Sequence, residues 1–362
     1  MSVANAPAPP SLETLLKAQA YGLGFDLVGI ARLGPAESAS AFEAWLDAGY
    51  AGEMAWLERG AEKRRDTRLA VPASRARTDA RATAVSAVVV AMDHGGREPA
   101  GPVARYARGD DYHDVMVERL RALHRRLEQV HGAPIDGKAY VDTGPLLERE
   151  LARRAGLGWY GKNTTLIAPG RGSFFFLGAL VLAAELEADV PFEADRCGTC
   201  RRCLDACPTD AFVGPRELDA TRCISYLTIE LKGAIPEALR EGVGDRLYGC
   251  DVCQNVCPWN QRFAQALAEP AFAPRDALAG RDARTLAREL LAMTQEELSA
   301  AFKNSPMKRA KLRGLKRNAA VVLGNVGTAN DVDALTRALD DVEPLVREHA
   351  LSALVRLGFS GP

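Results

Sequence analysis

Hydrophobic and polar residues alternate with two different periods over the first half of the chain. Residues 114–130 carry apolar side chains at helical spacing, which predicts an amphipathic helix. Continuous β-branched and apolar runs predict buried strands at residues 84–92 and 173–184. Shorter patterns predict two more strands and two more helices, at residues 25–33, 139–142, 11–23 (with Ser11 as N-cap) and 146–155. This mixture indicates an α/β (α+β) domain built on a central sheet.

The end of the chain has a different pattern, because residues from about 285 onward show helical periodicity only. A weak repeat aligns residues 317–321 with residues 347–351, and the two copies close at Gly327 and Gly358. Paired helices of this kind resemble HEAT repeats. Since about three repeats are needed for an independent array, two copies must pack on the rest of the molecule.

Composition places the chain among ordinary soluble proteins. Its 362 residues, 47% hydrophobic and 26% charged, suit two or three domains with their own cores. The longest apolar stretch, residues 174–184, is about half of the roughly 20 residues that span a bilayer. Residues 1–10 lack the basic region and apolar run of a signal peptide. We therefore expect a cytoplasmic protein with no membrane segment.

All eight cysteines lie between residues 197 and 257. The first four follow the C-x2-C-x2-C-x3-C-P spacing of bacterial ferredoxins, and Pro208 completes that run. Disulfides would need an oxidising compartment, and structural zinc usually uses two C-x2-C pairs rather than a triplet ending in Cys-Pro. Eight thiolates fill two [4Fe–4S] clusters with none left over. We therefore expect a protein that moves electrons one at a time.

The spacing also predicts which cysteines share a cluster. In two-cluster ferredoxins the cysteine before the proline ligates the other cluster. This rule predicts one cluster on Cys197, Cys200, Cys203 and Cys257, and a second on Cys207, Cys223, Cys250 and Cys253. An insertion at residues 224–249 interrupts the second run, and we expect it to reach away from the ferredoxin core. The predicted domains are therefore residues 1–185 (α/β), 186–262 (ferredoxin-type) and 263–362 (helical, HEAT-like).

Two segments of the first domain carry candidate chemistry. Asp142 ends a predicted strand, where ligands bind in open α/β sheets, and a raised pKa would make it a proton donor. The alternative is that Asp142 caps the next helix. Glycines around Trp159 either bring backbone close to a flat cofactor or form a loop without a ligand. His113, at a predicted helix start, either caps that helix, contacts substrate or lies on the surface.

Residues 303–317 contain seven cations and no acid. Charge on a helix usually forms a solvated face, but such faces normally mix signs. An unbroken basic stretch in a protein of net charge −1 favours contact with nucleic-acid phosphates.

Several long motifs in the same order resemble the epoxyqueuosine reductases. They are the cysteine segment with Cys223-Ile-Ser-Tyr-Leu-Thr and Gly249-Cys-Asp-Val-Cys-Gln, residues 105–113, Asp142-Thr-Gly-Pro-Leu-Leu-Glu-Arg, Gly156-Leu-Gly-Trp-Tyr-Gly-Lys-Asn, Gly172-Ser173, Ser305-Pro-Met-Lys-Arg-Ala-Lys and Lys316-Arg-Asn-Ala. The resemblance covers nearly the whole chain. It implies a cobalamin in the first domain, two [4Fe–4S] clusters beside it and a HEAT-like domain after them.

The resemblance also implies the reaction and its participants. The substrate is tRNA carrying epoxyqueuosine at the wobble position of the anticodon stem-loop, and removal of the epoxide oxygen gives queuosine and water. Two electrons come from an external low-potential donor, and the enzyme is expected to be a monomer. Asp142 is implied as the proton donor.

Further site residues are implied in the same way. Corrin contacts are expected at Arg65, Arg105, Asp142, Asn163, Thr165, Ser173, Ser225 and Asp251. Contacts to substrate and tRNA are expected at Tyr106, His113, Arg149, Lys232, Lys308, Arg309, Lys311, Arg313, Lys316 and Arg317. Three alternatives stay open: a cobalamin-dependent reductive dehalogenase, an electron-transfer ferredoxin fused to a scaffold, and an RNA-binding module with structural zinc.

Overall fold

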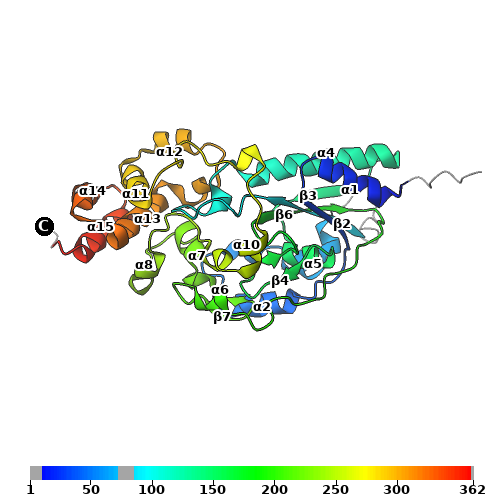
Figure 1. Cartoon of the computed structure of the whole chain (residues 1–362), viewed down its shortest axis with the longest axis horizontal. Helices are drawn as coiled ribbons and strands as arrows, with labels where there is room; N and C mark the ends of the chain where they lie inside the picture. Colours follow the sequence, from blue (N-terminus) through cyan, green and yellow to red (C-terminus); the bar gives the residue numbers. More distant parts are fainter. Residues whose placement is uncertain (1–9, 72–84, 360–362) are drawn as a thin grey trace, which may run out of the picture.

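The computed structural model describes residues 10–71 and 85–359. The molecule is elongated, with a sheet towards one end and a group of helices at the other (Figure 1). Residues 1–9, expected to hold no signal peptide, lie outside the described ranges, as does Ala84 at the start of a predicted strand. Within the described ranges, every helix is too short or too polar to cross a bilayer.

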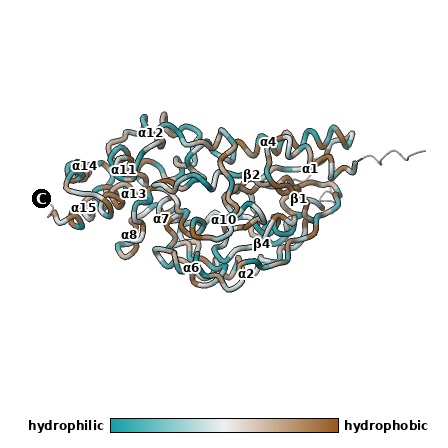
Figure 2. The backbone as a smooth tube through the Cα atoms, viewed as in Figure 1, coloured by the Kyte–Doolittle hydropathy of each residue, from teal (hydrophilic) through white to brown (hydrophobic). Residues whose placement is uncertain are grey.

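The central sheet has four strands in the order β1-β2-β6-β3, and every pairing is antiparallel. Its strands are β1 (Leu27–Arg32), β2 (Ser86–Asp93), β6 (Phe175–Leu182) and β3 (Gly137–Tyr140). The four predicted strands are thus confirmed. The sheet is of the α+β type, so the rule for ligands at parallel strand ends does not apply to it. Figure 2 shows hydrophobic residues concentrated around β1 and β2.

Helices cover both faces of the sheet (Figure 1). Val88 and Val90 of β2 point to one face, where they pack against α1 (Leu12–Gly22) and α4 (Tyr112–His131). Val89, on the opposite face, packs towards α5 (Glu148–Arg154). The alternation follows from the two-residue period of a strand, and burial on both faces explains why β2 and β6 are almost entirely apolar.

Three chain segments meet at one end of the strands of the sheet, here called the edge of the sheet. Since β2 and β3 both pair antiparallel with β6, they run in the same direction. Their ends at Asp93 and Tyr140 therefore lie at the same edge as Phe175, the start of β6. The loops after β3 and before β6 carry Asp142 and Ser173, so the antiparallel sheet still brings these two predicted site residues to one edge.

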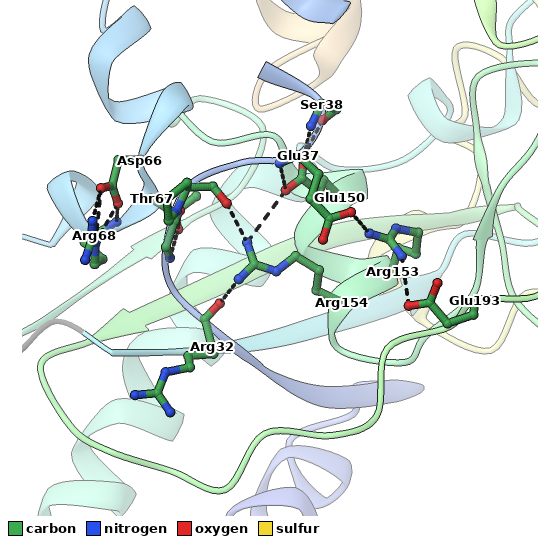
Figure 3. A network of polar contacts seen from close by, with 12 residues as sticks. Arg32, Glu37, Ser38, Asp66, Thr67, Arg68, Glu150, Arg153, Arg154 and Glu193 are labelled. Atoms are coloured by element: carbon green, nitrogen blue, oxygen red, sulfur yellow. Dashed lines mark hydrogen bonds and ion pairs between the residues drawn. The ribbon is translucent and has the colours of Figure 1, made fainter. Parts of the chain in front are cut away.

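A polar network fixes α5 beneath the sheet (Figure 3). The buried carboxylate of Glu150 accepts hydrogen bonds from the backbone N–H groups of Glu37 and Ser38, at 2.9 and 2.8 Å. Arg154 donates to the backbone carbonyls of Arg32 and Pro35. These bonds tie α5 to the chain leaving β1, so the loop between β3 and α5 is held at both of its ends.

The cysteine segment forms short elements along one side of the molecule (Figure 1). They are α6 (Arg202–Asp205), β7 (Phe212–Gly214), β8 (Glu217–Leu218), α7 (Ile224–Ile229), α8 (Glu237–Val243), α9 (Val252–Asn255) and α10 (Pro258–Phe263). The hairpin of β4 (Trp159–Tyr160) and β5 (Leu166–Ile167) lies against this segment through Trp159 and Trp259, whose ring centroids are 4.8 Å apart. Two short helices, α2 (Ala39–Asp47) and α3 (Ala61–Arg65), precede β2.

Five helices form the end of the chain, as the periodicity predicted. They are α11 (Ala283–Ala292), α12 (Gln295–Ala301), α13 (Lys311–Val326), α14 (Val332–Ala338) and α15 (Pro344–Arg356). The two sequence repeats lie in α13 and α15, which pack against each other. The insertion at residues 224–249 shares a hydrophobic core with these helices through Leu227, Ile235 and Leu247.

Candidate active site

The eight thiols fall into two neighbouring groups of four. The charges of Cys257, Cys197 and Cys200 act on Cys203, which places these side chains together. Cys253 lies among Cys223, Cys250 and Cys207, and it also faces Cys203 of the other group. The ferredoxin spacing predicts the same grouping, and which thiols share a cluster stays a prediction. All eight cysteines are free thiols, and no three His, Cys, Asp or Glu side chains within the described ranges are placed to hold a single metal ion.

The donor set of each group fits a [4Fe–4S] cluster, which takes four cysteine thiolates. Burial, followed by the charges of its three neighbours, raises the pKa of Cys203 to about 11. Burial likewise raises the pKa of Cys250 to about 11 and that of Cys253 well above its usual value. Bare thiolates are therefore unfavourable here, and a bound cation is the group that would stabilise them.

Residues of the cobalamin prediction surround the segment between Cys250 and Cys257. The buried Arg105 donates from its backbone N–H and its Nη1 to Asp251 Oδ2, at 3.0 and 2.9 Å. Asn163 donates to the Cys253 carbonyl at 3.5 Å and accepts from the Thr165 hydroxyl at 2.8 Å. The structure thus brings four of the eight predicted corrin contacts together, from three separate parts of the chain.

Ser173 joins the same group through two amide side chains. Gln254 Nε2 donates to Ser173 Oγ at 3.0 Å, and Asn260 Nδ2 donates to it at 2.9 Å. Gly172 precedes Ser173 with φ of 82°, and a Cβ there would lie 2.1 Å from Asn260 Oδ1. Only glycine fits this position. Gly158 has a structural role as well, since its Cβ would meet the Ile167 carbonyl oxygen at 2.2 Å within the β4–β5 hairpin.

Asp142 lies beside the start of α4, with 62% of its side chain exposed. Its carboxylate accepts a hydrogen bond from Tyr112 Oη at 2.8 Å and lies 3.7 Å from His113 Nε2. Asp111 caps α4, and its Oδ1 lies 2.6 Å from His113 Nδ1. Asp142 does not cap α5, because that helix begins six residues later, at Glu148. Instead Glu148 Oε1 accepts the Asp142 backbone N–H at 2.7 Å.

Protons are distributed unevenly over this group. Burial lowers the pKa of His113, but the hydrogen bond to Asp111 and the negative charges of Asp111 and Asp142 outweigh it and raise the pKa to about 9. Burial and then the Asp142 charge raise the pKa of Glu148 to about 8. Burial favours the neutral form of Asp142, yet the nearby His113 and the hydrogen bond from Tyr112 bring its pKa below the usual value. At neutral pH the protons therefore reside on His113 and Glu148, not on Asp142.

The helical end of the chain contacts the residues around Asp142. The backbone N–H of Asp111 donates to the Asn304 carbonyl at 2.8 Å. Arg309 pairs with Glu230 at 3.0 Å, and its guanidinium lies 5.7 Å from the ring centre of Trp56. The charge of Asp142 contributes to a raised pKa of Arg309, whose first cause is the Glu230 hydrogen bond. Arg309 and Asn304 of the helical end therefore lie near the Asp142 group.

Two family models match the chain. Residues 77–143 match the family described as "Epoxyqueuosine reductase QueG, DUF1730". Residues 196–260 match the "4Fe-4S double cluster binding domain".

Full-length relatives decide the family. The epoxyqueuosine reductase of Xanthomonas campestris pv. campestris is 40% identical over 370 residues, covering 99% of each chain. That of Pseudomonas aeruginosa is 41% identical, over 98% of this chain and 97% of its own. This chain belongs to the epoxyqueuosine reductase family.

Solved structures of epoxyqueuosine reductases share the fold. One contains an epoxyqueuosine-modified tRNA-Tyr stem loop and superposes with a TM-score of 0.83 at 33% identity, over 96% of this chain and 90% of the other. The Bacillus subtilis epoxyqueuosine reductase, solved with its catalytic aspartate loop swung out of the active site, superposes with a TM-score of 0.84 at 32% identity, over the same shares.

The predicted basic residues of this epoxyqueuosine reductase family member do not all face solvent. Lys308, Arg309, Lys311 and Arg313 are exposed, as tRNA contacts require. Two predictions need correction. Arg317 is only 1% exposed and donates to the carbonyls of Leu227, Leu231 and Gly233. Lys316 is mostly covered and pairs with Asp341 at 2.8 Å. Helical periodicity turns both side chains inward, which a count of charges did not reveal.

The other predicted residues lie at or near the site. Tyr106 packs between Tyr112 and Tyr248, with ring centroids 6.4 and 6.3 Å away. Ser225 lies beside Cys223 and opposes the rise in the pKa of that thiol that burial causes. Arg149 and Lys232 are exposed. Arg65 is exposed and paired with Glu43, and none of its hydrogen bonds to described residues reaches the other predicted corrin contacts.

Several residues of the site had no role in the sequence prediction. Tyr112, Asp111 and Glu148 stand inside quoted motifs, so their neighbours Asp142 and His113 were a usable signal. Gln254 also ends a quoted motif, whereas Asn260 carries no sequence signal beyond its place near the cysteines. Arg171 also escaped notice. It bridges Asp26 and Asp93, and burial, followed by the Asp26 charge, raises the pKa of Asp93 to about 6.

Proposed function

We propose that this protein reduces epoxyqueuosine in tRNA to queuosine, the last step in making that nucleoside. The observation that carries the proposal is the group of Asp142, Tyr112 and His113 at the start of α4, where the Asp111 backbone N–H donates to the carbonyl of Asn304, which precedes the exposed basic residues. Protons and a polyanionic substrate have a place there, and the two groups of four thiols would carry the electrons. The relative solved with an epoxyqueuosine-modified stem loop supports the choice of substrate.

The proposed cofactors are two [4Fe–4S] clusters and a cobalamin. Each group of four cysteines would hold one cluster, with the group containing Cys250 and Cys253 nearer the corrin. Arg105, Asn163, Thr165, Ser173, Ser225 and Asp251 would hold the corrin. Their amide, hydroxyl and charged groups suit a macrocycle edged with amides. Cobalamin, when bound, supplies a strongly reducing centre that delivers electrons to the epoxide.

The protein's own residues handle the protons. Removing an epoxide oxygen consumes two electrons and two protons and releases water, so the site must deliver acid to the departing oxygen. We assign that role to Asp142, which is ionised in the free protein. When bound RNA excludes water from Asp142, the neutral form of its carboxyl is favoured. His113 or Glu148 can then pass a proton to Asp142. An aspartate loop named as catalytic in the Bacillus subtilis relative supports this assignment.

The fold also supports a division of labour along the chain. We propose that residues 1–185 bind the cobalamin, residues 186–262 the clusters, and residues 263–362 the tRNA through HEAT-like helix pairs. Lys308, Arg309, Lys311 and Arg313 would contact phosphates of the anticodon stem-loop, and Tyr106, His113, Arg149 and Lys232 would lie near the modified nucleotide. We propose a cytoplasmic monomer that takes electrons from a separate donor.

Anaerobic reconstitution tests the proposal. Protein loaded with iron, sulfide and cobalamin should contain about eight irons and one cobalt, as two cubes and one corrin require. With a strong reductant it should convert epoxyqueuosine in an anticodon stem-loop to queuosine, detected by mass spectrometry of the nucleosides. Full cofactor occupancy without conversion would contradict the proposed reaction, and no iron uptake would contradict the cluster assignment.

A further inference from the structure

Four exposed arginines lie next to the cysteines of the first predicted cluster. This set, here called the outer group, is Cys197, Cys200, Cys203 and Cys257. Arg196, Arg201 and Arg202 flank Cys197, Cys200 and Cys203 in sequence, and Arg262 lies one turn beyond Cys257. Arg202 Nη1 reaches Gln261 Oε1 at 3.5 Å, and Trp259 Nε1 donates to the Arg196 carbonyl at 3.3 Å. These contacts join the two chain segments into one surface, here called the arginine face (Arg196, Arg201, Arg202 and Arg262).

The carboxylates nearby are mostly used by other arginines. Asp195 pairs with Arg216 at 2.6 Å, and Glu193 pairs with Arg153 at 3.4 Å. Asp205 is the partner of Arg201, at 3.4 Å.

Three members of the arginine face keep their positive charge unopposed. Arg196 and Arg262 lie over the rings of Phe192 and Phe263, at 5.6 and 5.0 Å from the centroids. Among the described residues no carboxylate lies within 4.0 Å of Arg196, Arg202 or Arg262. Because no carboxylate offsets these three guanidinium groups, the arginine face presents positive charge to solvent.

The arginine face lies directly over the predicted outer cluster. The Trp159 indole N–H points to Cys197 Sγ at 3.4 Å, and Trp259 packs edge-on against Trp159. Gly198 and Thr199, between two of the thiols, are exposed. A cluster in this group would therefore lie just beneath the surface, whereas in the other group the Cys253 carbonyl accepts a hydrogen bond from Asn163, one of the corrin candidates. Electron transfer falls steeply with distance, so electrons would enter at the outer group.

We propose that the arginine face is the docking site of the electron donor, and that the donor is a small acidic protein carrying one electron at low potential. The proposal rests on the proposed clusters. Each encounter oxidises one carrier and reduces one cluster, and two encounters supply the two electrons of one epoxide reduction. Opposite charges would steer the carrier to the outer cluster and hold it briefly, as in other transient redox pairs.

The position of the arginine face favours a protein carrier over RNA. In Figure 1, α6 and α10, which carry Arg202 and Arg262, lie apart from α13, which carries the exposed Lys311 and Arg313. Asp142 contacts Tyr112 and His113 of α4, and its charge acts on Arg309. RNA bound at Asp142 would therefore leave the arginine face free for the carrier.

Stopped-flow absorbance without RNA tests the proposal directly. The fully loaded enzyme is mixed anaerobically with a reduced plant-type [2Fe–2S] ferredoxin, an acidic carrier of low potential. The triple variant R196E/R202E/R262E should lower the second-order rate of cluster reduction about tenfold or more, and the wild-type rate should fall as salt rises. Reduced methyl viologen, a cationic donor, should reduce the variant at least as fast as the wild type.

A matched charge reversal on another face separates local docking from net charge. Arg121 and Arg125 are exposed on α4, and R121E/R125E should leave ferredoxin reduction unchanged. Equal ferredoxin rates in the triple variant and the wild type would overturn the proposal. So would weaker binding of the anticodon stem-loop by the triple variant with an unchanged ferredoxin rate, which would make the face an RNA surface. Since the readout is cluster absorbance, the result does not depend on the epoxide reaction.

Discussion

Glu148 Oε1 accepts a hydrogen bond of 2.7 Å from the backbone N–H of Asp142. Asp142 has φ of 54°, a left-handed conformation that is uncommon for a residue with a side chain. Such residues persist where the surroundings hold them, and here Glu148 supplies that hold from the first turn of α5. The Glu148 and Asp142 carboxyl groups also interact through their charges. Glu148 therefore affects both the position and the proton affinity of the proposed acid.

Removing the Glu148 carboxylate should therefore slow the reaction without weakening RNA binding. In Glu148→Ala the Asp142 N–H loses its acceptor, and kcat should fall on the order of 10²-fold because the acid is misplaced. Glu148→Gln keeps a carbonyl acceptor and should retain much more activity. Single-turnover rates and stem-loop affinity measure the two effects. Equal losses in both variants would assign the effect to charge and not to the hydrogen bond.

Asp142→Asn tests the acid itself. The amide keeps the size of the side chain and can still meet Tyr112 and His113, but it cannot supply a proton. Turnover should fall by about 10²-fold or more, a typical contribution of general acid catalysis, while cluster and cobalamin content stay unchanged. Retained turnover at full cofactor occupancy would remove Asp142 as the proton donor.

His113 should give the protein a stability that disappears in alkali. Its pKa is about 9 in the folded chain, against about 6.5 when unfolded. Folding thus favours the protonated ring, and this contribution is full below pH 6.5 and is lost as the pH rises through about 9. The Tm of the wild type should fall over that range, and the fall should be smaller in His113→Gln. An identical pH dependence of Tm in both proteins would contradict the pairing with Asp111 and Asp142.

The exposed and buried members of the basic stretch should behave differently. Replacing Lys308, Lys311 and Arg313 by Ala should weaken stem-loop binding and reduce the slope of log affinity against log salt by about one for each lost phosphate contact, with little change in Tm. Titrations at several salt concentrations measure this. An unchanged slope would mean that these side chains do not touch phosphate.

Arg317→Ala should instead destabilise the fold. It leaves three carbonyls without their donor, and each unpaired buried group costs about 1–3 kcal/mol, so a loss of several kcal/mol is expected. Thermal unfolding should show a clearly lower Tm, against an unchanged Tm in the matched exposed variant Lys308→Ala. Because Arg317 joins α13 to the insertion after Cys223, the loss should also reduce iron retention. A normal Tm would contradict the anchoring role.

Local pattern determined the elements of this protein and predicted the chemistry of its cysteine groups. The period of Met116, Leu120 and Leu123 predicted α4, and the spacing from Cys197 to Cys207 predicted cluster ligands, since both depend on residues close in sequence. The quoted motifs pointed to Asp142 before any contact was known.

Only the tertiary structure decided what depends on distant segments. The antiparallel direction of the sheet, the burial of Arg317 and the low pKa of Asp142 each come from partners about 30 to 90 residues away in the chain. The hold of Glu148 on Asp142 spans six residues, yet it exists because the turn between β3 and α5 adopts one conformation. Hydrogen bonds and charge interactions of this kind depend on distance in space, and sequence spacing alone does not contain it.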